Sequence, residues 1–188
     1  MMFSNLDIQE VLNNGSLKIE PLFEGAVRPA GVRLHLGELL LKPEPGITVD
    51  VHRGILPHYH EIKMTEEEGY VLQPGEFLLA ATYEKVSVGN NIGFLIEGRS
   101  TLARLGLTIV QTAMIVYPGH TNRSVTLELA NHGPNPIRLY PRMKIARAAI
   151  FELKSACEES YDTSGKYRDQ KDVGPPIFSG EIVSPIKK

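Results

Sequence analysis

The chain has 188 residues, of which 42% are hydrophobic, and its 20 basic and 22 acidic residues give a formal net charge of −2. This length is enough for one hydrophobic core, so a single domain spanning residues 1–188 is expected. The balanced charge gives no bulk electrostatic reason to bind nucleic acid or an anionic membrane. An anionic ligand must therefore meet a local cluster of cations.

The cysteine content and the length of the apolar runs indicate the cellular compartment in which the protein is expected. The single cysteine, Cys157, cannot form an internal disulfide or a multi-thiolate metal site, which favours a reducing compartment. The N-terminus lacks the basic and apolar regions of a signal peptide, and the apolar runs are too short to span a bilayer. We expect a cytoplasmic protein with no membrane segment.

The first predicted element is a helix over about residues 5–14, where Ser4 and Asp7 form a capping pattern and Gly15 a stop. Short apolar or alternating runs follow, separated by turns rich in Pro and Gly. This pattern predicts a mainly β fold, a distorted β-barrel or jelly-roll-like body. The predicted strand runs are SLKIEPL, VRLHL, ELLLK, ITVDVH, YVLQ, FLLAATYEKVSV, IGFLIEG, LTIVQTAMIVY, SVTLELA, IRLY and KIARAAIFEL.

The polar region 55–68 predicts an excursion from this body. Its alternate histidines, His58 and His60, could hold a metal on a strand, but no second ligand pair is evident in the sequence. The H-x-E and P-C-x-x-C signature of zinc deaminases, the Walker A loop and the dinucleotide fingerprint are absent from the sequence. We therefore expect no zinc and no metal held by protein side chains.

The segment Glu97–Gly106 predicts a helix of one to two turns capped by Ser100. Ser100 and Arg104 are four residues apart and share a face, while Arg99 precedes the positive helix end, so an anion could bind there. The alternative is a capped surface helix with two solvated arginines, and spacing alone favours that alternative.

Two further candidates are a strand and the tail. In the strand Ser124–Leu129, alternation places Glu128 opposite the core-facing residues, which usually indicates only the solvated face of a sheet. After Leu153 the apolar pattern ends, and residues 154–188 form a tail whose Lys166–Lys171 segment gathers three cations around Tyr167. Such a tail could close over a polyphosphate, or it could be a solvated extension.

The motifs together resemble one family. The segment Gly98–Leu107 closely resembles the GRSSLARLGL segment of dCTP deaminases, and four further motifs match in order and spacing. The matching motifs are Thr112-Ala113, Pro118-Gly119, Val125–Glu128 and Lys166–Gln170. The chain thus resembles the dCTP deaminase and dUTPase family from Asp7 to Gln170. The resemblance implies a dUTPase-type fold, a homotrimer with active sites between subunits, Mg²⁺ bound with the triphosphate, and dTTP as an inhibitor.

The resemblance also implies residue roles. Glu128 would be the general base that activates water, while Ser100, Arg104 and the backbone at Ala113 would position the water and the developing charge. A carboxylate near the water is what deamination without a metal requires, and rigidly held donors suit the charge. The residues expected to bind the substrate or order the closed tail are Arg99, Ser100, Thr112, Tyr117, Tyr161, Lys166, Tyr167 and Gln170.

Several positions depart from the family pattern. Tyr117 replaces an Asp that meets the sugar, His120 replaces an aromatic residue, Ile115 replaces an Arg, and Arg33 replaces an Asp. Because dUTPases need the carboxylate missing at Tyr117, the first prediction is deamination of dCTP to dUTP and ammonia in pyrimidine deoxynucleotide synthesis. The alternatives are a bifunctional deaminase–diphosphatase or dUTPase, and a nucleotide-binding homologue without catalysis. A modified cytosine or a ribonucleotide as substrate is also left open.

Overall fold

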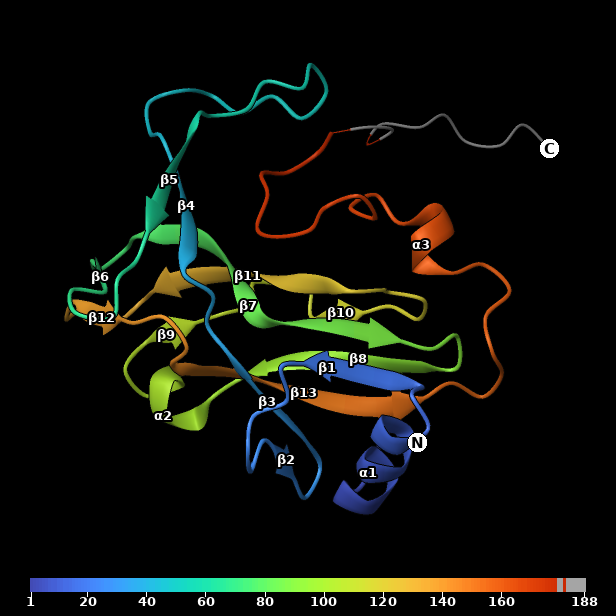
Figure 1. Ribbon diagram of the computed structural model, residues 1–188. Coiled ribbons are helices and arrows are strands. Elements are labelled where there is room, and N and C mark those ends of the chain that lie inside the picture. Colours follow the sequence, from blue (N-terminus) through green and yellow to red (C-terminus); the bar gives the residue numbers. More distant parts are fainter. Residues whose placement is uncertain (179–180, 182–188) are drawn as a thin grey trace.

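Antiparallel β-strands form the body of the computed structural model, which describes residues 1–178 and 181 (Figure 1). One main sheet has the strand order β5-β4-β7-β11-β9, with β1 also paired to β7. Its strands are β1 (Leu17–Glu20), β4 (Leu39–Pro43), β5 (Tyr59–Lys63), β7 (Phe77–Val88), β9 (Leu107–Thr108) and β11 (Arg123–Asn131).

The second main sheet has the order β10-β8-β13-β3-β2, and a small third sheet pairs β12 with β6. The strands of the second sheet are β2 (Val27–Arg28), β3 (Gly31–His35), β8 (Ile92–Gly98), β10 (Ile115–Val116) and β13 (Lys144–Glu152). Those of the small sheet are β6 (Tyr70–Leu72) and β12 (Ile137–Leu139). The helices are α1 (Asn5–Asn13), α2 (Ser100–Ala103) and α3 (Tyr161–Ser164).

The hydrophobic core combines side chains from both main sheets. Leu127 and Leu129 of β11 and Phe94 of β8 are all fully buried in one cluster. Their alternation along each strand directs one face inward, as the sequence predicted. The mainly β, jelly-roll-like fold is therefore confirmed. None of the helices in the described part of the chain is long and apolar enough to cross a membrane.

The expected barrel closure is wrong for the described residues, because the two main sheets stay separate. Near β3, the bridge from Leu36 to Thr82 of β7 and the hydrogen bond from the Gly37 amide to the Ala81 carbonyl connect the sheets without forming a ladder. Closure requires a continuous ladder, whereas the outer strands β2, β9 and β10 have only two residues each. The arrangement is thus an open pair of sheets.

The predicted N-terminal helix is confirmed as α1. The Ser4 hydroxyl accepts from the Asp7 amide, and the Asp7 carboxylate accepts from the Ser4 amide, which completes a capping box. The predicted cap of the second helix is wrong. Arg99 is the N-cap of α2 and makes no side-chain cap hydrogen bond, while Ser100 is the first helical residue.

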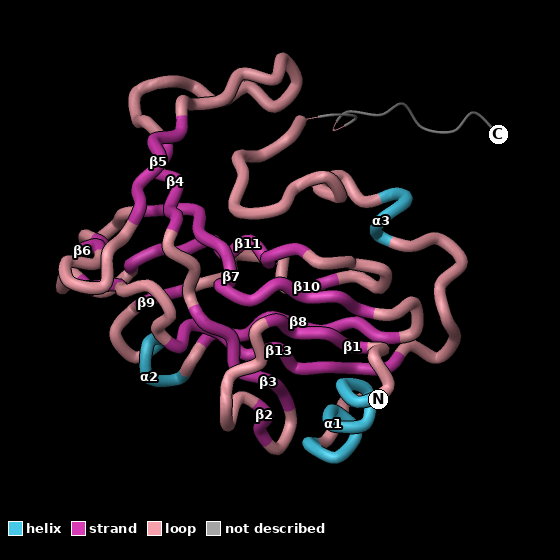
Figure 2. Tube along the Cα trace, in the orientation of Figure 1, coloured by secondary structure: helices cyan, strands magenta, loops and turns pink. Residues whose placement is uncertain are grey.

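Two predicted strands also differ from the structure. The run LTIVQTAMIVY divides into β9 and β10, which belong to different sheets, because the chain crosses between the sheets at residues 109–114. The run ITVDVH forms only one bridge, Asp50 to Ile55, at the end of the long β4–β5 hairpin. This hairpin projects from the sheets and contains part of the excursion expected for residues 55–68, but residues 59–63 of that range form β5 of the main sheet (Figure 2).

Candidate active site

A cavity of about 650 Å³ lies between β10, β11 and the C-terminal tail. This volume is in the range of small-molecule sites. Its lining residues are Tyr59, Phe77, Leu79, Ala113, Ile115, Val116, Tyr117, His120, Arg123, Ser124, Val125, Thr126, Glu128, Tyr161, Lys166, Tyr167, Gln170, Gly174 and Pro176.

Glu128 supplies a carboxylate to this cavity from the middle of β11. The Gln111 amide donates a hydrogen bond to its Oε2 at 3.0 Å, and the Glu128 amide donates to the Ile109 carbonyl. Burial raises the pKa of Glu128, and the hydrogen bond from Gln111 lowers it by a smaller amount. A raised pKa makes a carboxyl group a stronger proton acceptor, and the protonated group can later return the proton.

Residues 109–114, which cross from one main sheet to the other, lie beside Glu128. This segment is fixed to β11 at Ile109 and Gln111, and to β8 because the Ile96 amide donates to the Met114 carbonyl. Ala113 lines the cavity, whereas Thr112 does not. The division of the predicted strand is thus what places the backbone at Ala113 near Glu128.

Hydrogen bonds to β11 and to the turn after β10 hold the C-terminal tail over the cavity. The Tyr161 amide donates to the Pro118 carbonyl at 2.9 Å, and Gln170 Nε2 donates to Thr126 Oγ1 at 2.8 Å. Gly119 is required beside the first of these bonds, because its φ is +75° and an added Cβ would lie 2.4 Å from the Ser160 Cβ. These contacts place the tail residues Lys166, Tyr167 and Gln170 in the cavity wall.

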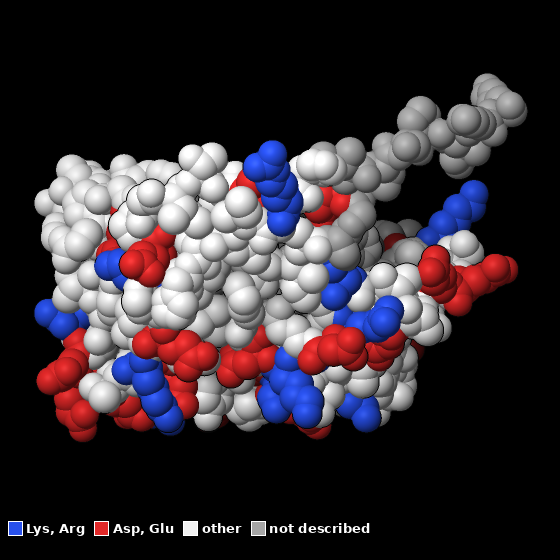
Figure 3. Space-filling model, turned by 90° about the horizontal axis from the view of Figure 1, so that it is seen from above, with Lys and Arg blue, Asp and Glu red and all other residues white. Residues whose placement is uncertain are grey.

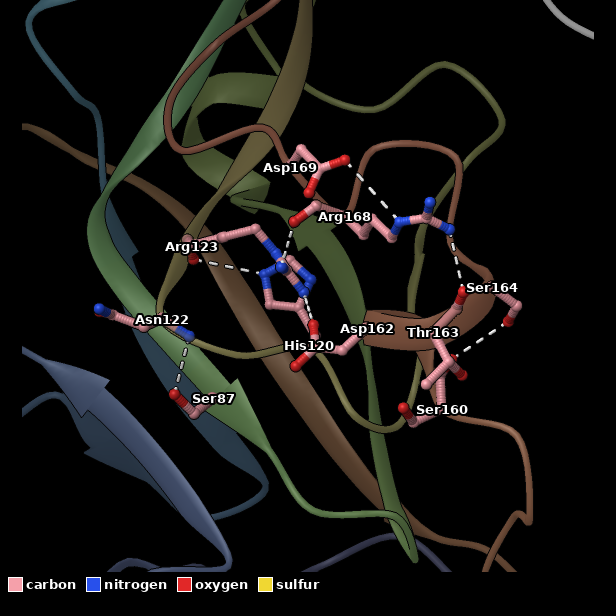
Figure 4. A network of polar contacts seen from close by, with 10 residues as sticks. All are labelled: Ser87, His120, Asn122, Arg123, Ser160, Asp162, Thr163, Ser164, Arg168 and Asp169. Atoms are coloured by element: carbon pink, nitrogen blue, oxygen red, sulfur yellow. Dashed lines mark hydrogen bonds and ion pairs between the residues drawn. The ribbon is translucent and has the colours of Figure 1, made fainter.

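A buried arginine connects β11 to the tail (Figure 4). Arg123 is 9% exposed and donates hydrogen bonds to the Asp162 carboxylate and the Arg168 carbonyl. Burial raises the pKa of Asp162, but hydrogen bonds from Thr121 and Arg123 outweigh burial and hold it below its usual value. Within the described residues, the Arg123 Nε has no hydrogen-bond partner. The cavity therefore contains a cation that the carboxylate of Asp162 already neutralises.

Aromatic rings form the wall beside Arg123. Tyr117 and Tyr161 lie parallel within 6°, with ring centroids 6.3 Å apart, and the His120 ring lies 5.6 Å from Tyr161. Burial lowers the pKa of His120, so its ring is neutral near pH 7. Where the resemblance expects an Asp and an aromatic residue, this wall thus presents the Tyr117 ring and the neutral His120 ring.

The cavity contains most of the residues predicted for the site. Those that line it are Ala113, Tyr117, Glu128, Tyr161, Lys166, Tyr167 and Gln170. Four predicted residues do not line it: Arg99, Ser100, Arg104 and Thr112. Arg99 donates a hydrogen bond to the Lys144 carbonyl, and Ser100 and Arg104 are exposed on and after α2. A single chain therefore does not bring α2 and Glu128 to one cavity.

Several residues of the cavity were not predicted from the sequence, among them Arg123 and Tyr59. Alternation along β11 places Arg123 on the same face as the buried Leu127 and Leu129, and a charged residue on a core face is a signal of function. Tyr59 lies between two exposed histidines, so the same period directs its side chain to the opposite face. Both signals were present in the sequence.

Comparison with known proteins shows the family to which the chain belongs. A family model described as dCTP deaminase-like matches residues 2–153, and the chain belongs to that family. The dCTP deaminase, dUMP-forming, of Streptomyces coelicolor is 34% identical over 182 residues, covering 91% of this chain and 92% of that protein. The dCTP deaminase of Natronomonas pharaonis is 36% identical over 181 residues, covering 93% and 92%.

A solved structure supports the fold. The 2'-deoxycytidine 5'-triphosphate deaminase from Agrobacterium tumefaciens aligns with a TM-score of 0.61 at 18% identity. The alignment covers 79% of this chain but 48% of that longer chain, so it supports the fold alone. The family assignment depends on the family model and on the more similar sequences.

Proposed function

We propose that this chain catalyses the hydrolytic deamination of dCTP to dUTP and ammonia, with Glu128 as the general base. The observation that carries the proposal is the partly buried carboxylate of Glu128, whose pKa is raised in a cavity of nucleotide size. Relatives at 34–36% identity bear the name dCTP deaminase, which supports the same reaction.

The proposed chemistry needs no metal-bound water. Glu128 takes a proton from water as the water oxygen bonds to C4 of cytosine, and passes this proton to N3 of the ring. Glu128 then takes the proton of the new C4 hydroxyl and passes it to the amino nitrogen, so that the C4–N bond breaks, ammonia leaves and the C4 carbonyl forms. The raised pKa of Glu128 suits both transfers, because the group must bind the proton and then release it.

The tail would hold the triphosphate. Lys166 in the cavity wall forms an ion pair with Glu181, and phosphate oxygens could replace that carboxylate. Gln170 is already oriented by Thr126. Mg²⁺ would arrive with the triphosphate as part of the substrate. Inhibition by dTTP and a cytoplasmic location stay predictions.

A neighbouring subunit would complete the site in a homotrimer. Arg99, Ser100 and Arg104 are outside the cavity of their own chain, and residues 111–115 beside it are exposed. The β4–β5 hairpin also exposes apolar side chains: Ile47, Val49, Val51 and Ile55. Seen from the hairpin side, the charges lie mostly along one margin and much of the remaining face is uncharged (Figure 3). The exposed apolar side chains and the largely uncharged face both suit contact with another copy of the chain.

Mixing two inactive variants tests the shared site. Co-expressed Glu128→Gln and Arg104→Ala chains are expected to regain dCTP deamination, because a mixed trimer has some sites with both residues intact. Each variant alone should release little ammonia, as measured by a coupled ammonia assay. Mixed oligomers purified with two tags that show no more activity than the parents would contradict a site between subunits.

The dUMP-forming reaction is the second candidate, because the Streptomyces coelicolor relative bears that name. The cavity has Tyr117 where the resemblance expects the Asp needed for diphosphate release. We therefore expect dUTP to accumulate from dCTP, and added dUTP to stay intact, when nucleotides are separated by chromatography. Formation of dUMP from either nucleotide would assign the chain to the dUMP-forming branch instead.

A further inference from the structure

We infer that the outer face of the β4–β5 hairpin is a binding site for a divalent transition metal ion such as Zn²⁺, formed by Glu44, His58 and His60. A potential ligand atom from each of the three residues lies within 4.8 Å of the others. The sequence showed the two histidines but no third ligand. The fold supplies that ligand, because Glu44 lies on the neighbouring arm of the hairpin.

The backbone of the hairpin holds the three residues together. The Glu44 amide donates a hydrogen bond to the His58 carbonyl at 2.8 Å, and the neighbouring pair in register is Pro43 and Tyr59. His58 and His60 are two positions apart, so both point to one face. Their rings contact edge to face, with centroids 4.7 Å apart. The ligand set is thus assembled by strand pairing.

The side-chain distances are close to those of a coordinated ion. Glu44 Oε2 lies 3.9 Å from His58 Nδ1 and 3.7 Å from His60 Nε2. Ligands of tetrahedral zinc, with bonds of about 2.1 Å, lie about 3.4 Å apart. The three side chains are 56–67% exposed, so small rotations meet no packed neighbour. Two imidazoles and one carboxylate would leave a coordination position for water.

The lysines of the hairpin do not compete with a metal ion for Glu44, because each forms an ion pair with a different carboxylate. Lys42, the cross-strand partner of His60, lies 2.7 Å from Glu76, and Lys63 lies 3.1 Å from Glu38. Within the described part of the chain, the ion pairs of Glu44 are those with the two histidines. The carboxylate is therefore available to a metal.

The donor set selects the class of ion. Imidazole nitrogen favours zinc, copper or nickel, whereas Mg²⁺ and Ca²⁺ prefer an all-oxygen shell. Such an ion would join β4 to β5 on the face opposite Tyr59, which lines the cavity. The site is separate from the cavity and does not depend on the proposed reaction.

Zinc titration of the tag-free, chelator-treated chain tests the site by calorimetry. We expect one ion per chain in the wild type, and affinity lower by about tenfold or more in His60→Ala and in Glu44→Gln, because each removes a ligand. His132→Ala is the matched control, since His132 is exposed and outside the cluster. It should bind like the wild type, and Mg²⁺ should not compete.

Thermal melting of each variant without metal verifies the fold, which these exposed substitutions should leave intact. The inference is overturned if the wild type binds no zinc, if the His60→Ala and Glu44→Gln variants bind as tightly as the wild type, or if His132→Ala loses as much affinity as they do. The last result would mean that zinc binds surface histidines in general.

Discussion

Glu128→Gln is expected to reduce ammonia release from dCTP by about 10²–10⁴-fold, because the variant loses the group that takes the proton from water. The glutamine keeps an oxygen that can accept the hydrogen bond from the Gln111 amide. The loss should therefore be in kcat, with the oligomer and nucleotide binding retained. Steady-state assays and equilibrium binding of dCTP measure the two effects separately.

Thermal melting provides the control for this variant. Burial raises the pKa of Glu128 in the folded chain above its unfolded value, so ionising this group disfavours the folded state as pH rises through the folded pKa. Glutamine does not ionise, so the variant should melt at the same or a higher temperature at pH 7. Undiminished turnover in Glu128→Gln would refute the assignment of the base. A lower melting temperature would indicate that the variant loses activity because its fold is less stable.

Truncation after Gly165 is expected to lower kcat/KM for dCTP by roughly 10- to 100-fold, mainly through KM, because a charge-assisted hydrogen bond contributes about 1.5–3 kcal/mol. The cut removes Lys166 and Gln170 from the cavity wall but keeps α3, whose Asp162 pairs with Arg123. Steady-state kinetics over a wide range of dCTP concentration measures the change.

A pair of single substitutions separates the phosphate contact from general loss of the tail. Lys166→Ala should reproduce part of the rise in KM, whereas Lys171→Ala should not, because Lys171 is exposed and does not line the cavity. A normal KM in the truncated chain would exclude a role for the tail in binding the triphosphate. Equal effects of the two lysines would indicate only a change in surface charge.

Much of the fold was predictable because burial imposes a period on each segment. The alternation of Val125, Leu127 and Leu129 identified β11 and the outward Glu128, and the Ser4 and Asp7 pair identified α1. Local patterns did not predict where the chain passes between sheets. The run LTIVQTAMIVY has the apolar content of one strand, yet its two ends pair in different sheets.

The site was less predictable, because it combines segments that are distant in the sequence. Gln170 lines the cavity of Glu128 and bonds to Thr126, and Asp162 pairs with Arg123, because the tail folds back over β11. Spacing shows neither contact. Ser100 and Arg104 were predicted from motif similarity, and the fold of one chain leaves them outside the cavity, which is why the proposed site needs a second subunit.

The most direct test is a time course of ammonia release from dCTP with Mg²⁺ by the purified, full-length chain. If the chain is a dCTP deaminase, ammonia forms in equal amount to the dCTP consumed, at a rate proportional to the concentration of the protein. Binding of dCTP without any ammonia would contradict the proposed deamination. It would show that the aromatic wall of Tyr117, His120 and Tyr161 belongs to a nucleotide-binding homologue without this activity.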